Sequence, residues 1–348
     1  MRNRIVAAAL LAAMVFSMAG CKKIEQDEPS VTPVPTVIPS ASPTPEPEPK
    51  TVSPITGLAW DEDLPFNPIA VMVENHVDAR PQSGLSKADL VYEAYVEGEI
   101  TRFMAIYMSE FPQKVGPVRS SRVYYLDWVA EWDPIYVHYG GSQPKGRDDF
   151  NIYSKIGTMN IRDRVDGMTD SGSITRDSSR QAPHNAYADL TKIAEKGKDG
   201  AQAMKAGFAH TKSVSGGDAA TGIDIAYSQL NQNILRYEYN PKSGTYDRFV
   251  MDEPFTDRET GGQITAKNII VQKTTHSGVG INALIDLKAI GSGECIYFMD
   301  GQAFEGSWEK KSRDEATVYY DTEGEIMQFL PGNIWVQVVS GAATVHYQ

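Results

Sequence analysis

Cysteine is almost missing from this chain of 348 residues, which contains only Cys21 and Cys295. There is no Cys-x-x-Cys pair, and the six histidines are scattered without a His-x-x-x-His pair. The sequence therefore predicts neither a disulfide scaffold nor a metal site. No glycine-rich nucleotide loop follows a strand, so no cofactor is expected either. Stability must come from a hydrophobic core.

Long hydrophobic runs are also absent. The apolar stretch near the start covers residues 5–16, which is shorter than the roughly 20 residues that a membrane-spanning helix needs. Arg2 and Arg4 precede it, and residues 17–21 resemble a lipobox that ends in Cys21. We expect a signal peptide over residues 1–20, acylation of Cys21, and an extracytoplasmic protein that this lipid anchors to the cell membrane bilayer.

Basic residues are in deficit, with 33 Lys and Arg against 45 Asp and Glu and a net charge of −12. The first 50 residues carry five charges of each sign, so the acidic excess lies in the remainder of the chain. An acidic body repels nucleic acid, which is not expected as a partner. Anions can bind only where basic side chains gather locally.

Large apolar residues are scarce from Gln26 to Pro54, a segment that holds nine of the twenty prolines. Such a composition cannot bury enough surface to fold, and it favours extended polyproline-like conformers. Residues 21–54 are therefore predicted to be a tether that holds the folded body away from the membrane.

Residues 55–215 combine strand and helix patterns. The continuous apolar run 69–73 predicts a strand that is buried on both faces. Two further runs flank a Glu-Gly-Glu turn and predict a hairpin of residues 90–96 and 101–107. Ser120 or Ser121 is expected to cap a helix that ends at Trp132. The remaining elements expected here are a strand over 135–139 and a helix over 186–206.

Residues 221–348 show short β-branched and aromatic runs between turn signals. Hairpins are predicted for residues 234–239 with 246–250 and around Asp300-Gly301. Further strands are expected over 264–272, 316–320 and 335–339. The sequence thus indicates an α+β protein with a mixed α/β N-terminal domain, a layered sheet with helices, and a smaller β-rich C-terminal domain.

An unusual basic cluster lies in residues 114–122 and contains Arg119, Ser120, Ser121 and Arg122. Arginine forks, hydroxyls and the free N–H groups of a helix start favour phosphate or carboxylate, so this cluster and Arg102 are candidate anion ligands. Equally, Arg119 and Arg122 could pair with glutamates 93, 97 or 99 and have a structural role.

His138 and His184 are candidates for acid or base catalysis because histidine titrates near neutrality. His138 ends a predicted strand before a Gly-Gly-Ser loop, and His184 precedes Asn185 at a predicted helix start. In α/β folds, ligands bind near strand ends and helix starts, so His138, His184 and Asn185 are included in the candidate binding site. A structural role remains open for both histidines, and Tyr139 is left open between the core and the site.

Several ordered motifs resemble those of the YerB-like lipoproteins of Gram-positive bacteria. The resemblance covers essentially the whole chain from about Pro54 onwards and implies a two-part body of unknown function. It is carried by Asn75 and by residues 79–85, 88–93, 101–103, 116–122, 138–142, 182–185, 260–272 and 306–310.

Three functions stay open. The first is binding of an anionic envelope component, such as a cell-wall glycopolymer, through Arg102, Arg119, Arg122, His138, His184 and Asn185. The second is an envelope hydrolase or transferase with His138 or His184 as its base. The third is a scaffold that recruits envelope proteins. The sequence names no ligand and leaves enzymatic activity undecided.

Overall fold

The computed structural model describes residues 51–60, 67–161, 163–170, 172–197, 205–228, 233–341 and 343–348. They belong to one compact unit, Glu48–Gln348. The expected signal peptide, Cys21 and nearly all of the expected tether lie outside the described residues. Val52 already pairs with Ala59 in an antiparallel bridge, so the folded body includes the residues before Ile55. No described helix is long and apolar enough to cross a membrane.

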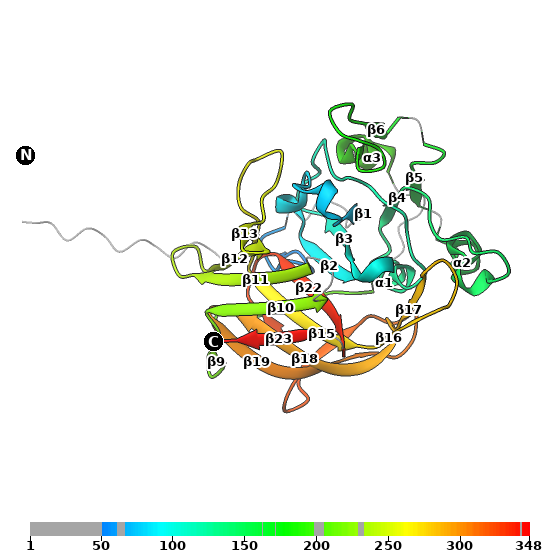
Figure 1. Ribbon diagram of the computed structural model, residues 1–348. Helices are drawn as coiled ribbons and strands as arrows, with labels where there is room; N and C mark the ends of the chain where they lie inside the picture. Colours follow the sequence, from blue (N-terminus) through cyan, green and yellow to red (C-terminus); the bar gives the residue numbers. More distant parts are fainter. Residues whose placement is uncertain are drawn as a thin grey trace, which may run out of the picture. The chain divides into compact units, whose positions relative to one another are not determined.

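One mixed sheet extends through both halves of the body (Figure 1). Among the described strands its order is β20-β19-β18-β15-β22-β2-β3-β1-β4-β5, and β9 pairs with β19 at the side. Its N-terminal strands are β1 (Ile69–Glu74), β2 (Leu90–Tyr95), β3 (Thr101–Tyr107), β4 (Ile135–His138) and β5 (Arg164–Asp166). Its C-terminal strands are β9 (Asp218–Ala219), β15 (Asn268–Thr274), β18 (Gly291–Met299), β19 (Gln302–Lys310), β20 (Val318–Asp321) and β22 (Ile334–Ser340).

A second sheet and three small strand pairs complete the described β structure. The second sheet holds β10 (Gly222–Ser228), β11 (Asn233–Asn240), β12 (Thr245–Val250), β13 (Glu253–Pro254), β14 (Thr265–Ala266) and β23 (Thr344–Tyr347). The small pairs are β6 (Ile174–Arg176) with β7 (Ala186–Ala188), β8 (Ala209–His210) with β21 (Gln328–Phe329), and β16 (His276–Gly278) with β17 (Ile285–Leu287).

The helices are short and few in the described ranges. They are α1 (Tyr125–Trp132), α2 (Ile152–Met159) and α3 (Leu190–Lys196), with single 3₁₀ turns η1 (Val77–Ala79), η2 (Leu85–Lys87), η3 (Glu97–Glu99) and η4 (Asp148–Phe150). Figure 1 places α2 and α3 near β4 to β6, away from β18 and β19. The expected α+β class, with a β-rich C-terminal part, is confirmed.

The long sheet is buried on both faces where the two halves meet. Every residue of β1, β2 and β3 is buried, and for β1 its apolar run predicts this. On one face, Tyr92 of β2 stacks on Trp128 of α1, with ring centroids 5.0 Å apart. On the other face, Phe298 of β18 contacts Tyr347 of the second sheet at 5.4 Å. The sheet is therefore the middle layer between α1 and the second sheet.

Strands β2 and β22 join the halves by parallel pairing, with Leu90 opposite Ile334 and Glu93 opposite Gln337. The side chain of Glu93 lies 2.8 Å from the Arg248 guanidinium of β12, and neither side chain is exposed. Four aromatic rings surround that guanidinium, those of Phe103, Tyr237, Phe255 and Trp335.

A second buried ion pair lies on the α1 side of the same sheet. Lys310 of β19 is 2.8 Å from Glu131 of α1, and neither side chain is appreciably exposed. Tyr92 donates a hydrogen bond to the same glutamate at 3.0 Å, and so does the Thr317 amide at 2.8 Å. A buried ion pair that water does not reach therefore connects elements on each face of the junction.

Three hairpins agree with the sequence. β2 pairs with β3, β11 with β12, and β18 with β19 through the Asp300-Gly301 turn.

The free Cys295 on β18 is buried, and burial raises the pKa of its thiol well above the usual range.

The expected start of the first helix is wrong. Helix α1 begins at Tyr125 without a side-chain cap, because residues 119–121 are extended and bond to residues 139–141. The Ser121 hydroxyl accepts from Tyr136 at 2.6 Å, and the Ser120 hydroxyl donates to the Tyr139 carbonyl at 3.0 Å. The arginine cluster therefore lies before the helix and not on its free N–H groups.

The helix expected over residues 186–206 is also wrong in extent. Residues 186–188 form β7, and Asp189 caps α3 by accepting from the amides of Thr191 and Lys192. The helix ends at Gly197, which has a φ of 69°. Asp189, a favourable N-cap residue, marks the start of this helix, and Gly197 marks its end.

We predict that Arg248→Met destabilises the protein by about 3–5 kcal/mol, because Glu93 is left as an unpaired buried charge. The double variant Glu93→Gln, Arg248→Met should recover part of that loss. Urea unfolding measures both free energies of unfolding. Glu294→Gln removes the partner of Lys273 in an exposed pair and serves as the control, with an expected change of about 0–1 kcal/mol. Equal losses in the single and double variants would contradict the coupling.

Candidate functional site

The candidate site lies at one edge of the sheet, where three parallel strands end. β1 is parallel to β4, and β4 is parallel to β5. Their last residues, Glu74, His138 and Asp166, therefore meet at the same edge, which is where open α/β sheets bind ligands. Two loops cross this edge: the Glu74 amide donates to the Pro117 carbonyl at 2.9 Å, and the Val118 amide to the Ala186 carbonyl at 2.7 Å.

Glu74 connects the two loops through its carboxylate, which is 3% exposed. One oxygen lies 2.9 Å from Arg119 Nε. The other oxygen lies 2.8 Å from His184 Nδ1. Because a carboxylate can only accept here, Nδ1 of His184 carries a proton, and in the tautomer that this contact selects the lone pair is on Nε2.

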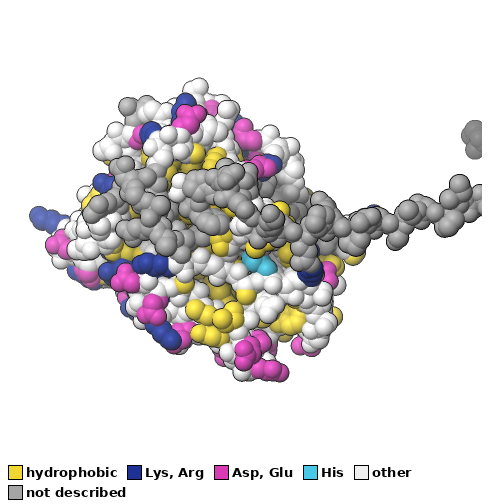
Figure 2. All heavy atoms as spheres, turned by 180° about the vertical axis from the view of Figure 1, so that it is seen from behind, with side chains coloured by type: hydrophobic (Ala, Val, Ile, Leu, Met, Phe, Trp, Pro, Cys, Tyr) yellow, Lys and Arg dark blue, Asp and Glu magenta, His cyan; other side chains and the backbone are white. Residues whose placement is uncertain are grey.

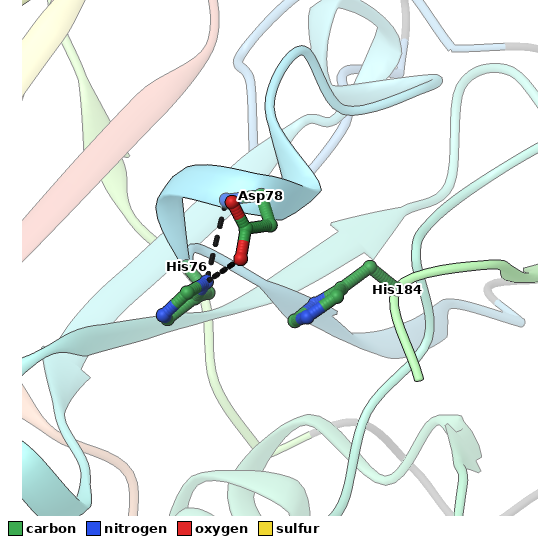
Figure 3. Close-up of side chains that lie close together, drawn as sticks. All are labelled: His76, Asp78 and His184. Atoms are coloured by element: carbon green, nitrogen blue, oxygen red, sulfur yellow. Dashed lines mark hydrogen bonds and ion pairs between the residues drawn. The ribbon is translucent and has the colours of Figure 1, made fainter. Parts of the chain in front are cut away.

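The ring of His184 stacks on that of His76, with centroids 5.2 Å apart and an interplanar angle of 17°. His76 caps the turn η1, and its Nδ1 lies 3.4 Å from a carboxylate oxygen of Asp78 in the same turn. Figure 3 shows these three side chains turned toward one another from two separate segments of the chain. Their ligand atoms all lie within 4.8 Å of one another.

Of the other expected anion ligands, Arg102 is buried and Arg122 is partly buried in an ion pair. Arg122 binds both carboxylate oxygens of Glu97, and these bonds outweigh burial and lower the pKa of Glu97. Arg102 donates to the Ser120 carbonyl at 2.6 Å. Burial, with the nearby charges of Arg122 and Arg119, lowers the pKa of Arg102 to about 10. Neither residue belongs to the lining of the cavity that Arg119 lines.

Arg119 does line a cavity of about 360 Å³, together with Arg176 and Tyr139. Arg176 stacks over the Tyr139 ring, with Cζ 4.9 Å from its centroid, and donates to the Tyr139 hydroxyl at 2.9 Å. It also donates to the side-chain carbonyl of Asn185 at 2.6 Å. Asn185 therefore positions an arginine that the sequence analysis did not single out.

In the described ranges, the lining of this cavity contains the two arginines and no other charged residue. Among the described residues, Arg176 forms no ion pair, since its partners are a neutral amide and a hydroxyl. We call this space the arginine cavity. A larger depression of about 660 Å³ in the C-terminal half is different, because its charged lining is entirely acidic, with Asp218, Glu305, Asp321, Glu323 and Glu325.

Figure 2 shows the molecule from behind the view of Figure 1, with basic and acidic side chains interspersed over the described surface.

His138 is fully buried at the end of β4. Its Nδ1 lies 2.9 Å from the Gly140 carbonyl, and its ring stacks on Tyr136. Burial, partly offset by Asp166, lowers the pKa of His138 below its usual 6.5. Of the two candidate histidines, His184 alone has exposed surface.

Four residues of the site were not predicted from the sequence: Glu74, His76, Asp78 and Arg176. A signal for the first three was present, since polar residues follow directly on the buried run that forms β1. Arg176 had no such signal, because it belongs to a short strand whose position depends on β7.

Two family models match this sequence. The N-terminal domain of the protein of unknown function DUF3048 matches residues 55–203, and the C-terminal domain of the same family matches residues 223–336. The chain therefore belongs to the DUF3048 family, in agreement with the resemblance seen in its motifs. In this chain, strands of both matched regions lie in one sheet.

A curated relative, "Putative lipoprotein YerB" of Bacillus subtilis (strain 168), is 32% identical over 297 residues, which cover 83% of this chain and 86% of the relative. The crystal structure of YerB protein from Bacillus subtilis is similar in fold, with a TM-score of 0.73 and 31% identity. That match covers 85% of this chain and 100% of the solved one.

We predict that His138→Gln weakens the acid sensitivity of the fold. The folded protein keeps His138 neutral, whereas the unfolded chain protonates it near pH 6.5, so acid favours the unfolded state. The wild-type free energy of unfolding should therefore fall as the pH drops from about 7 to 5, and less steeply in the variant. Urea unfolding across this range measures the slope, and His346→Gln, at an exposed position, is the control. An unchanged slope in His138→Gln contradicts the assignment.

Proposed function

We propose that this protein is a lipid-anchored extracytoplasmic binding protein whose arginine cavity takes the phosphate or carboxylate group of a cell-envelope component. The signal pattern that ends in Cys21 supports the anchor, as does the similarity to a protein named as a putative lipoprotein. The unpaired guanidinium of Arg176 carries the binding proposal.

Arg176 is exposed, and it differs from the arginines that carboxylates hold. Elsewhere in the described body, Arg122 and Arg248 are held by carboxylates, and Arg119 shares Glu74 with His184. Arg176 is instead held by neutral acceptors, which orient its fork and leave its charge uncompensated. A planar guanidinium in a fixed orientation is well suited to a bidentate anion.

The rest of the arginine cavity suits an anion attached to an apolar or sugar-like body. Tyr139, Tyr153 and Met168 lie in the same lining, and Met168 is 65% exposed. An exposed thioether beside aromatic rings offers an adaptable apolar surface. A phosphate-bearing glycopolymer or a peptidoglycan fragment combines both chemical features.

We expect Arg176→Gln to weaken anion binding at least tenfold, which corresponds to about 1.4 kcal/mol. Thermal unfolding is followed with inorganic phosphate, teichoic acid and peptidoglycan fragments, because a ligand at 100 times its Kd stabilises the folded state by about 2.7 kcal/mol. Arg236→Gln is the matched control, since Arg236 also stacks on an aromatic ring, with its Cζ 4.8 Å from the centroid of the Phe249 ring. If none of these ligands stabilises the protein in a saturable way, the proposal is contradicted, and a scaffold that recruits envelope proteins is favoured.

A hydrolase or transferase at the same edge is the second candidate, and the contact of Glu74 with His184 favours it. A carboxylate that fixes the tautomer of a partly exposed histidine is the usual arrangement of a general base. Mass spectrometry of teichoic acid and peptidoglycan after incubation would detect a product. A product that His184→Gln abolishes would support this candidate, and unchanged substrates would leave binding alone.

The anchor has its own test. We expect Cys21→Ser to abolish incorporation of a labelled fatty acid and to move the protein from the membrane fraction to the soluble fraction, because residue 21 then lacks the thiol. Cys295→Ser is the matched control, since that thiol is buried and free. Equal membrane association of wild type and Cys21→Ser would contradict lipid anchoring.

A further inference from the structure

We propose that His76, Asp78 and His184 bind one divalent transition-metal ion of the Zn²⁺ type. This site is separate from the arginine cavity, and the proposal does not depend on anion binding. The sequence analysis expected no metal, because the two histidines are far apart in sequence and form no short motif.

The chemistry of the three side chains fits such an ion. Two imidazoles and one carboxylate are a common ligand set of Zn²⁺ and related metals. All three ligand atoms lie within 4.8 Å of one another, although they come from η1 and from the loop before β7. A metal ion must lie in the plane of each imidazole, so the His76 ring has to turn out of its stack on His184 to close the set. The exposure of these side chains leaves room for that rotation, since Asp78 is 67% exposed and His76 is 38% exposed.

Glu74 prepares His184 as a ligand. The buried carboxylate accepts from Nδ1 at 2.8 Å, which directs the lone pair of Nε2 away from Glu74. Metal-binding histidines generally donate their other ring nitrogen in this way, and the carboxylate fixes the ring and raises its basicity. Glu74 is itself held by Arg119, so this second contact is built into the fold.

The contact between His76 and Asp78 also favours a bound cation. The Asp78 amide donates a long hydrogen bond of 3.3 Å to His76 Nδ1, which makes that nitrogen an acceptor. The same nitrogen faces an Asp78 carboxylate oxygen at 3.4 Å, so two electron-rich atoms point at each other. Two ligand atoms about 2.1 Å from a tetrahedral ion are about 3.4 Å apart. A cation between them would take the lone pair of Nδ1 in place of this long hydrogen bond and would compensate the charge of the carboxylate.

A proton on His76 would also relieve this repulsion, and it is the alternative that an experiment must separate. Protonation concerns His76 and Asp78 only, whereas a metal ion needs His184 as well. Three protein ligands would leave one coordination position open to solvent or to a further ligand, as in catalytic zinc sites. Pro183, the residue before His184, lines the arginine cavity, so the two sites are neighbours.

The test uses the Cys21→Ser protein, freed of any affinity tag, and Co²⁺ as a spectroscopic probe. We expect one Co²⁺ per chain, with the visible absorption of a tetrahedral or five-coordinate site, and displacement by one equivalent of Zn²⁺. His184→Gln and Asp78→Asn should each weaken Co²⁺ binding at least tenfold. His346→Gln, at an exposed histidine on β23, should bind as wild type does.

Asp78→Asn keeps the test valid if His184→Gln does not fold, because the Asp78 side chain is largely exposed. Circular dichroism verifies the fold of each variant. Absence of stoichiometric Co²⁺ binding would overturn the proposal and leave protonation of His76 as the explanation. Binding that either folded variant leaves unchanged would overturn the three-ligand site.

Discussion

The parallel pairing of β2 with β22 is the contact on which the rest of the structure depends. It joins the regions matched by the two family models inside one sheet, so neither region has a complete sheet by itself. A buried ion pair stabilises each face of this junction: Glu93 with Arg248, and Glu131 with Lys310. Charges in these positions are costly to separate, and they are satisfied only when both halves are folded together.

The same junction reaches the candidate site through Asn75. The amide of Asn75 donates to Glu93 at 3.1 Å and to Thr101 at 2.8 Å, so the residue after β1 is fixed to the buried ion pair. Arg80 donates to the side chain and the carbonyl of Asn75, at 3.1 and 3.0 Å. His76 follows immediately. The turn that offers His76 and Asp78 is therefore held from both ends by the interior of the protein.

Short-range patterns were sufficient for much of the fold. The apolar run of β1 and the three hairpins are local features, and their residues carry the signals directly. The boundaries of α1 and α3 were missed because tertiary contacts at Ser121 and a strand at residues 186–188 replaced the local preference for helix. The continuity of the sheet had no local signal, since Leu90 and Ile334 pair across most of the chain.

The site was less predictable for a related reason. Arg119 and His184 were visible as unusual residues, but their shared partner Glu74 was not, because three segments distant in sequence meet there. The arginine cluster looked like one anion site, whereas Arg102 is buried, Arg122 is paired with Glu97, and Arg119 lines the cavity. Which arginine keeps an unpaired charge depends on neighbours that only the folded chain supplies.

Native-state hydrogen exchange in increasing urea tests the central claim, that the two halves form one cooperative unit around β2 and β22. Peptides from the two strands and from β1 and β12 are followed by mass spectrometry. The account predicts that all four exchange through the same global opening, with one free energy and one dependence on urea. Exchange of β12 and β22 through a separate opening of lower free energy, while β1 and β2 stay protected, would contradict it.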